Sequence, residues 1–178
     1  MMKNIAFTGL LIAALGTGVA PLAMAKMPAK ADSSAPAYKI DKASFVKVVT
    51  SANEFEIESS KLAEQKAKDP DVKEFAKQMI ADHTKAAEGL KKAAMLGSDA
   101  PTLSPKHAAM LETLKGASEQ DFQPLYIDMQ AGAHNEAVSL FATYAGGGDD
   151  KAVEAFARKT LPTLEMHKMH VQKLVAAH

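Results

Sequence analysis

Residues 61–83, KLAEQKAKDPDVKEFAKQMIADH, determine how this chain begins to fold. Asp69 can cap a new helix and Pro70 suits its first position, so one helix ends and another starts here. The two expected helices span about 41–68 and about 69–97. Because the connection is so short, they must form an antiparallel hairpin. Their apolar faces repeat every three or four residues, at Phe45, Val49, Ala52, Ala63, Val72, Phe75, Met79 and Leu90.

A second hairpin is expected around the glycine triplet 146–148, which interrupts another pair of helical patterns. The first of these helices should span about 118–145. Asp149 or Asp150 can cap the next one, which should continue almost to the C-terminus. The chain therefore contains four long amphipathic helices arranged as two tight hairpins.

The segment between the hairpins, residues 97–118, is interrupted by Pro101 and Pro105. A short extra helix is expected inside it, at about 106–115. No strand-like alternation of any length appears, so the sequence predicts an all-α fold, a four-helix bundle domain over 41–178 with a long middle connection. If this connection runs the length of the bundle as a crossover, the arrangement is ferritin-like, and we favour that arrangement.

The N-terminal residues have the pattern of an export signal. Lys3 supplies a positive charge, the run 5–20 is largely apolar, and Ala23-Met24-Ala25 is a small-x-small motif. These features predict a signal peptide over 1–25, cleaved after Ala25, in an exported protein. The alternative is an N-terminal membrane anchor, for which the apolar run is short. Residues 26–40 are rich in Lys, Ala, Ser and Pro and are expected to form a disordered linker.

The composition restricts the partners. Basic and acidic residues balance at 21 each, and no basic face or run appears, so nucleic acid is not an expected partner. The chain has no cysteine, which excludes thiolate metal sites and iron–sulfur clusters. No second apolar stretch is long enough to span a bilayer, so no membrane association is expected after cleavage. The sequence leaves any protein partner and the oligomeric state open.

One polar residue lies near the middle of each long predicted helix: Glu56, His83, His134 and His167. In helical projection Glu56, His83 and His167 fall on the apolar faces, whereas His134 lies at the edge of its face, one turn after Gln130. A buried unpaired charge costs several kcal/mol, so such groups must satisfy one another or hold a ligand. Antiparallel helices packed in register would bring all four to one level.

One carboxylate with two or three imidazoles suits a single transition-metal ion such as iron, zinc, copper or manganese. The sequence therefore predicts a metal site of Glu56, His83 and His167, with His134 bound directly or in support. The alternative is a structural or interaction module whose metal-free polar layer only fixes helix packing. A third option is a metal-dependent redox enzyme such as a peroxide scavenger.

Methionines near these histidines raise a competing possibility, a site specific for copper(I). Met79 stands four residues before His83, and Met166 four residues before His170. Met79 belongs to the core face of its helix, however, and methionine commonly fills cores. No nucleophile motif and no phosphate-binding glycine loop are visible, so the sequence leans against an enzyme.

Several motifs resemble one known family. They are EIESSKLA at 56–63, VKEFA at 72–76, MIADH at 79–83, Asp121-Phe122 with Tyr126, His134, and Thr160-Leu161-Pro162 before His167. Over about residues 41–176 they resemble an exported bacterial family of ferritin-like bundles known as domain of unknown function 4142. The resemblance implies a ferritin-like four-helix fold and a periplasmic location, and it supplies no established activity.

The wider ferritin-like group is known for di-iron sites in which two helices carry Glu-x-x-His motifs. Here Ile80 stands three residues before His83, and Leu164 three residues before His167. Neither residue is a carboxylate, so a mononuclear site is expected rather than a dinuclear one. The expected role is metal handling or stress protection.

Overall fold

The structure is a computed structural model that describes residues 39–178. The predicted signal peptide, residues 1–25, and nearly all of the predicted linker, residues 26–40, lie outside the described residues. Within 39–178 every regular element is an α-helix, as expected for an all-α fold. The helices are α1 (Lys42–Lys66), α2 (Pro70–Ala94), α3 (Pro105–Gly116), α4 (Phe122–Gly147) and α5 (Lys151–Ala177).

Local chemistry explains where the helices begin and end. Asp69 caps α2 as predicted, since its carboxylate accepts a hydrogen bond from the Asp71 N–H at 2.7 Å. Helix α2 ends at Ala94, earlier than expected, because Met95 adopts the left-handed conformation with φ 56°. Helix α4 continues through Gly147, past its predicted end. The short extra helix expected between the hairpins is α3.

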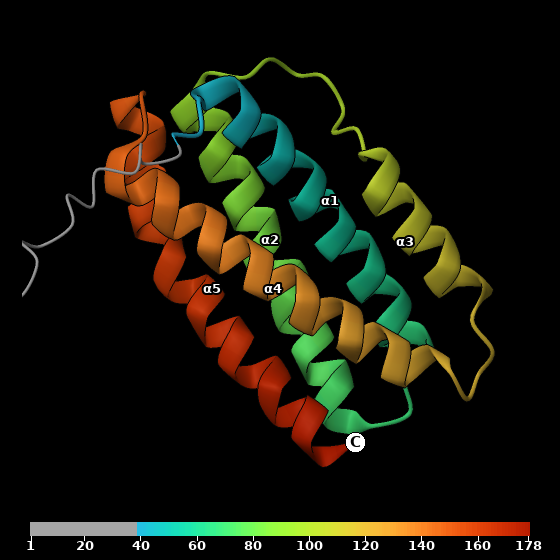
Figure 1. The fold of residues 1–178 in the computed structure, drawn as a ribbon. Coiled ribbons are helices and arrows are strands. Elements are labelled where there is room, and N and C mark those ends of the chain that lie inside the picture. The colour runs from blue at the N-terminus through green and yellow to red at the C-terminus, as the bar shows by residue number, and fades with distance from the viewer. Residues whose placement is uncertain (1–38) are drawn as a thin grey trace, which may run out of the picture. The chain divides into compact units, whose positions relative to one another are not determined.

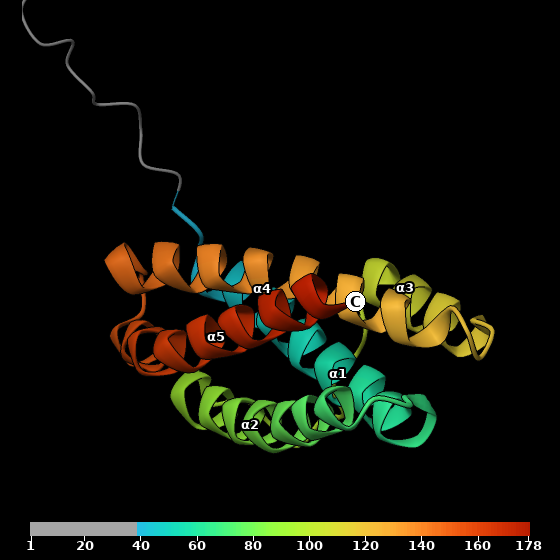
Figure 2. The same cartoon turned by 90° about the horizontal axis from the view of Figure 1, so that it is seen from below.

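The four long helices pack around a shared interior. Helix α1 contacts α2 and α4, and α5 contacts the same two helices. Figure 2 shows α2 and α4 on opposite faces of this group. The short α3 lies outside it, against α1 and α4 (Figure 1). Among residues 39–178, no helix combines the length and the apolar character needed to cross a bilayer.

Contacts at the helix ends establish the direction of each helix. The backbone N–H groups of Lys68 and Asp69 donate to Gln123 Oε1 at 3.1 and 3.0 Å, so the α1–α2 connection lies beside the start of α4. At the opposite end Lys42 pairs with Asp150 at 2.8 Å, which places the start of α1 beside the start of α5. The segment between α2 and α4 therefore runs the length of the helices, along the outside of α1 (Figure 1).

Two apolar clusters fill the interior, one toward each end. The Phe75 cluster comprises Ala63, Ala67, Val72, Phe75, Ala76, Met79, Leu114, Phe122, Tyr126, Ile127, Val171 and Leu174. The Phe45 cluster comprises Phe45, Val49, Leu90, Ala94, Phe141, Tyr144, Ala145, Val153, Phe156, Ala157 and Leu164. Between them the helices turn polar side chains inward. This polar layer consists of Asn53, Glu56, Ser59, Ser60, His83, Gln130, His134 and His167.

Candidate metal centre

The four residues singled out from the sequence all lie in the polar layer. Each comes from a different long helix, and none is more than 4% exposed. His134 is as deeply buried as the others, although its helical projection placed it at the edge of the apolar face. Glu56, His83, His134 and His167 therefore all lie on the inward faces of their helices.

The three histidines converge on one point. One ring nitrogen from each of His83, His134 and His167 lies within 4.8 Å of the other two. The ring centroids are 5.7 Å apart for His83 and His134, 5.5 Å for His83 and His167, and 5.4 Å for His134 and His167. A metal ion bound to three imidazoles at its usual bond length would hold the nitrogens about 3.4 Å apart. Small ring movements would suffice for all three to bind one ion.

One ring nitrogen of His83 and one of His134 each form a hydrogen bond with an oxygen atom that accepts it. His83 Nδ1 lies 2.8 Å from Asn53 Oδ1 on α1. His134 Nδ1 lies 2.9 Å from the backbone carbonyl oxygen of Gln130, one turn earlier on α4. Because these oxygens only accept, each Nδ1 carries the ring proton and each Nε2 keeps its lone pair. Both Nε2 atoms are buried and have no hydrogen-bond partner among the described residues.

In His167 the two ring nitrogens have exchanged roles. Its Nε2 donates to Asp82 Oδ2 at 3.1 Å, so its Nδ1 keeps the lone pair. Within residues 39–178 this Nδ1 is also buried without a partner. Asp82 immediately precedes His83 on α2, and its other oxygen lies 3.5 Å from Lys85 Nζ. Its side chain is 24% exposed, so Asp82 connects the buried His167 ring to the surface.

This arrangement fits a metal ion. Histidines that bind metals usually donate their second ring N–H to a carbonyl or carboxylate, which fixes the tautomer and the ring orientation. His83, His134 and His167 each do so, and each ring keeps one buried nitrogen that has no partner among residues 39–178. An unsatisfied buried polar atom costs about 1–3 kcal/mol, and one ion would satisfy all three.

Burial keeps the three rings neutral. Desolvation lowers the pKa of His83 well below its ordinary 6.5, and the neighbouring His134 and His167 rings lower it further. Desolvation also lowers the pKa of His134 to about 4, although its bond to the Gln130 carbonyl opposes this shift. The pKa of His167 is lowered by burial, with Asp82 acting in the opposite direction. At neutral pH an ion would therefore find three lone pairs free of protons.

Glu56 lies in the same layer but outside this group of three. Its carboxyl oxygens are not among the atoms that lie within 4.8 Å of one another. Desolvation raises the pKa of Glu56 to about 8, while the nearby Gln130 amide lowers it in part. The Gln130 Nε2 group also donates to Ser59 Oγ at 3.2 Å. At neutral pH Glu56 is therefore an uncharged acid between α1 and α4.

Sequence reasoning did not identify the residues that orient the rings. Asn53 lies three residues before Glu56, so it shares the inward face of α1, and this spacing could have revealed it. Asp82 immediately precedes His83 on α2, but its partner His167 lies on another helix. That contact depends on how α2 packs against α5, which a helical projection does not contain.

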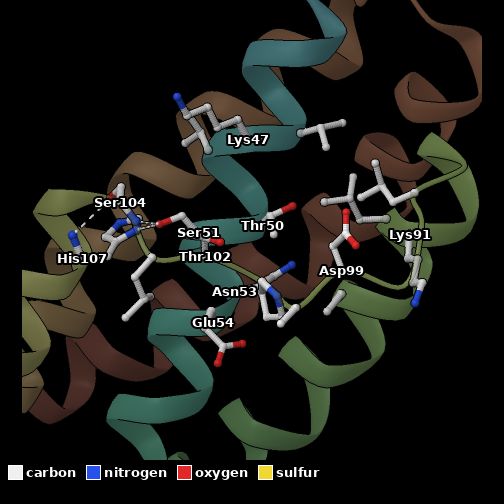
Figure 3. Close-up of a pocket in the computed structure, with 18 of the residues that line it drawn as sticks. Lys47, Thr50, Ser51, Asn53, Glu54, Lys91, Asp99, Thr102, Ser104 and His107 are labelled. Carbon is white, nitrogen blue, oxygen red and sulfur yellow. Dashed lines mark hydrogen bonds between the residues drawn. The ribbon is translucent and has the colours of Figure 1, made fainter.

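A cavity of about 820 Å³ lies between α1, the end of α2 and the segment that leads into α3. Figure 3 shows Ser51, Ser104 and His107 at one end of this cavity and Lys91 and Asp99 at the other. Ser51 Oγ lies 2.6 Å from His107 Nδ1 and accepts the Ser104 N–H at 2.7 Å. Of the polar layer, only Asn53 lines the cavity. None of the three histidines lines this cavity, which touches their group only through Asn53, the partner of His83.

Comparisons with known proteins agree with the fold and the motifs. No curated protein matches the sequence. The solved structure of CopM in the Cu(II)-bound form is similar, with a TM-score of 0.63 and 18% identity, over 77% of this chain and 97% of that chain. At this identity the likeness shows a shared fold. The family model described as "Domain of unknown function (DUF4142)" matches residues 27–174, most of the chain, so the protein belongs to this family, as its motifs indicated.

Proposed function

We propose that this protein handles metal by binding one transition-metal ion through His83 Nε2, His134 Nε2 and His167 Nδ1. The observation that carries the proposal is the convergence of the three rings, since one nitrogen from each lies within 4.8 Å of the other two. Each ring also keeps one buried nitrogen without a partner among residues 39–178. Glu56 adjoins the site as an uncharged acid. The scaffold we propose is a ferritin-like bundle, because two helical hairpins are joined by a segment that runs their full length.

Copper(II) is the ion we expect to bind most tightly, followed by zinc. Imidazole nitrogens suit borderline ions, and affinity in such sites rises toward copper across the first transition row. The similarity in fold to CopM, a protein solved with Cu(II), supports testing copper first. Methionine ligands are not part of the proposed site, because Met79 is buried in the Phe75 cluster, whereas Met166 and Met169 are exposed.

A metal-free structural layer is the competing explanation, and hydrogen bonding disfavours it. The single proton of each neutral ring is already used on Asn53, on the Gln130 carbonyl or on Asp82. The three histidines therefore have no protons left to donate to one another. Each uncompensated lone pair costs about 1–3 kcal/mol in the metal-free state. Binding an ion removes this cost.

We also propose that the protein works in the periplasm after cleavage following Ala25. The charged, apolar and small-x-small segments of residues 1–25 support export. N-terminal sequencing of protein from a periplasmic fraction should start at Lys26. A chain that retains Met1 would contradict this proposal. A site for one ion in this compartment fits metal buffering or protection from metal stress.

Titration of the metal-free protein with Cu(II), Zn(II), Fe(II) and Mn(II) tests the site. We expect one tightly bound ion per chain, and no tight binding in the His83→Ala/His134→Ala/His167→Ala variant. The His107→Ala variant is the matched control, because His107 pairs with Ser51 outside the polar layer. Circular dichroism should show that all variants remain helical. Equal binding by the triple variant, or no binding by the wild type, would exclude this site.

A further inference from the structure

A cleft of about 290 Å³ between α2 and α5 reaches two of the three histidines. His83 and His167 line it, whereas His134 does not. The remaining walls come from side chains of α2 and α5. Within the described residues, this cleft is thus a path from the surface toward the candidate metal centre.

One end of the cleft is tightly packed. A Cβ atom at position 89 would lie 3.1 Å from Phe156 Cε2, so Gly89 allows the Phe156 ring to pack close against α2. Besides the two histidines, the polar residues that line the cleft are Asp82, Lys85, Lys159, Thr160 and Thr163. A hydrated ion would therefore move along these polar groups and away from Phe156.

The histidine nitrogens themselves are covered, so one ring must turn for an ion to reach them. The partners of the rings differ in exposure: Asn53, which holds His83, is 5% exposed, and Gln130, whose carbonyl holds His134, is fully buried. Asp82, which holds His167, is 24% exposed and lines the cleft. His167 is thus the ring whose hydrogen bond solvent and ions can reach.

We propose that metal ions reach the three histidines through the α2–α5 cleft, and that Asp82 is the positioning residue that holds His167 and meets the incoming ion. This inference rests on the proposed function. An ion drawn to the Asp82 carboxylate weakens its hydrogen bond with His167. The freed His167 ring then turns and binds the ion through its lone pair. When the ring turns back, the ion comes within reach of His83 and His134.

Charge along the cleft should control the rate of uptake. The wall carries one carboxylate, Asp82, and two ammonium groups, Lys85 and Lys159. Lys85 lies 3.5 Å from Asp82 and offsets its charge in part. Lys159 is exposed, so it adds a positive charge that opposes a cation on this path. Removing this positive charge should speed uptake, and removing the Asp82 charge should slow it.

Stopped-flow mixing of the metal-free protein with Cu(II) measures the route directly. The Thr163→Trp variant fills the cleft, and we expect uptake slowed at least about tenfold with the same final one-ion stoichiometry. The control is Thr143→Trp, the same substitution at an exposed position on α4. If Thr163→Trp takes up Cu(II) at the wild-type rate, the route is wrong and the metal site stands. If the wild type binds no ion, the proposed function fails as well.

Charge variants provide a second test that leaves the packing intact. Lys159→Glu should speed uptake by about threefold to tenfold at low salt, and the gain should vanish at high salt. Lys173→Glu, further along α5 and outside the cleft, should have little effect. Asp82→Asn keeps an oxygen for His167 but removes the charge, so it should slow uptake. Equal rates for Lys159→Glu and Lys173→Glu would overturn the proposal.

Discussion

The polar layer has a histidine half, which comprises His83, His134, His167 and Asn53, and a carboxyl half, which comprises Glu56, Ser59 and Gln130. Both halves are buried, but burial shifts the pKa values of their titratable groups in opposite directions. In the histidine half, desolvation lowers the pKa values of His83, His134 and His167. In the carboxyl half, desolvation raises the pKa of Glu56 to about 8. Both halves are therefore uncharged at neutral pH. What distinguishes them is geometry, because one ring nitrogen from each histidine lies within 4.8 Å of the other two, whereas the oxygens of Glu56 are not part of this group.

The largest expected effect separates the two halves by metal affinity. His134→Ala removes one of three proposed ligands and should weaken metal binding at least about a hundredfold. Glu56→Gln, at a similarly buried position outside the group of three, should change affinity much less. Isothermal titration with Cu(II) or Zn(II) measures both. A comparable loss in Glu56→Gln would mean that the carboxyl half supplies a ligand, as the sequence alone suggested.

The next effect separates the halves by pH. Between pH 6.5 and about 8, folded Glu56 keeps the proton that the unfolded chain loses near its ordinary pKa of 4.5. The free energy of unfolding of the metal-free wild type should therefore fall by roughly 2 kcal/mol as pH rises through this window. Glu56→Gln should remove this slope. Urea denaturation at several pH values measures it, and parallel curves for both proteins would contradict the assignment.

For the histidine half, the slope of the free energy of unfolding against pH should have the opposite sign. Its folded pKa values lie below 6.5, so the unfolded chain binds more protons as the pH falls. Stability from these rings is complete above pH 6.5 and is lost toward about pH 4, the folded value for His134. This loss of stability at low pH should persist in Glu56→Gln. The contributions of the two halves can therefore be separated in one set of measurements.

The smallest expected effect concerns a residue that accepts a hydrogen bond from one of the histidine rings. Asn53→Ala removes the acceptor that orients His83 and should weaken metal binding about tenfold. Ser59→Ala is the matched control, because it removes a hydrogen bond to Gln130 in the carboxyl half. Titration calorimetry should show an unchanged affinity in this control. Equal losses in both variants would point to a general loosening of the polar layer.

Much of the helical framework could be predicted from local sequence. The Asp69-Pro70 boundary, the all-α content and the short α3 all follow from capping and periodicity within a few residues. The ends of α2 and α4 could not, because Met95 adopts a left-handed conformation that favours glycine and Gly147 stays helical. The export signal remains a prediction, as do the linker and the metal itself.

The sequence by itself determined that Glu56, His83, His134 and His167 lie at the middle of their helices, because helix phase and length are local properties. Only the tertiary structure decided which of them meet and which ring nitrogen is left free. The orienting oxygens for His83 and His167 lie on neighbouring helices, at Asn53 and Asp82. A tautomer set by a hydrogen bond across two helices depends on their packing, and no pattern within one helix contains it.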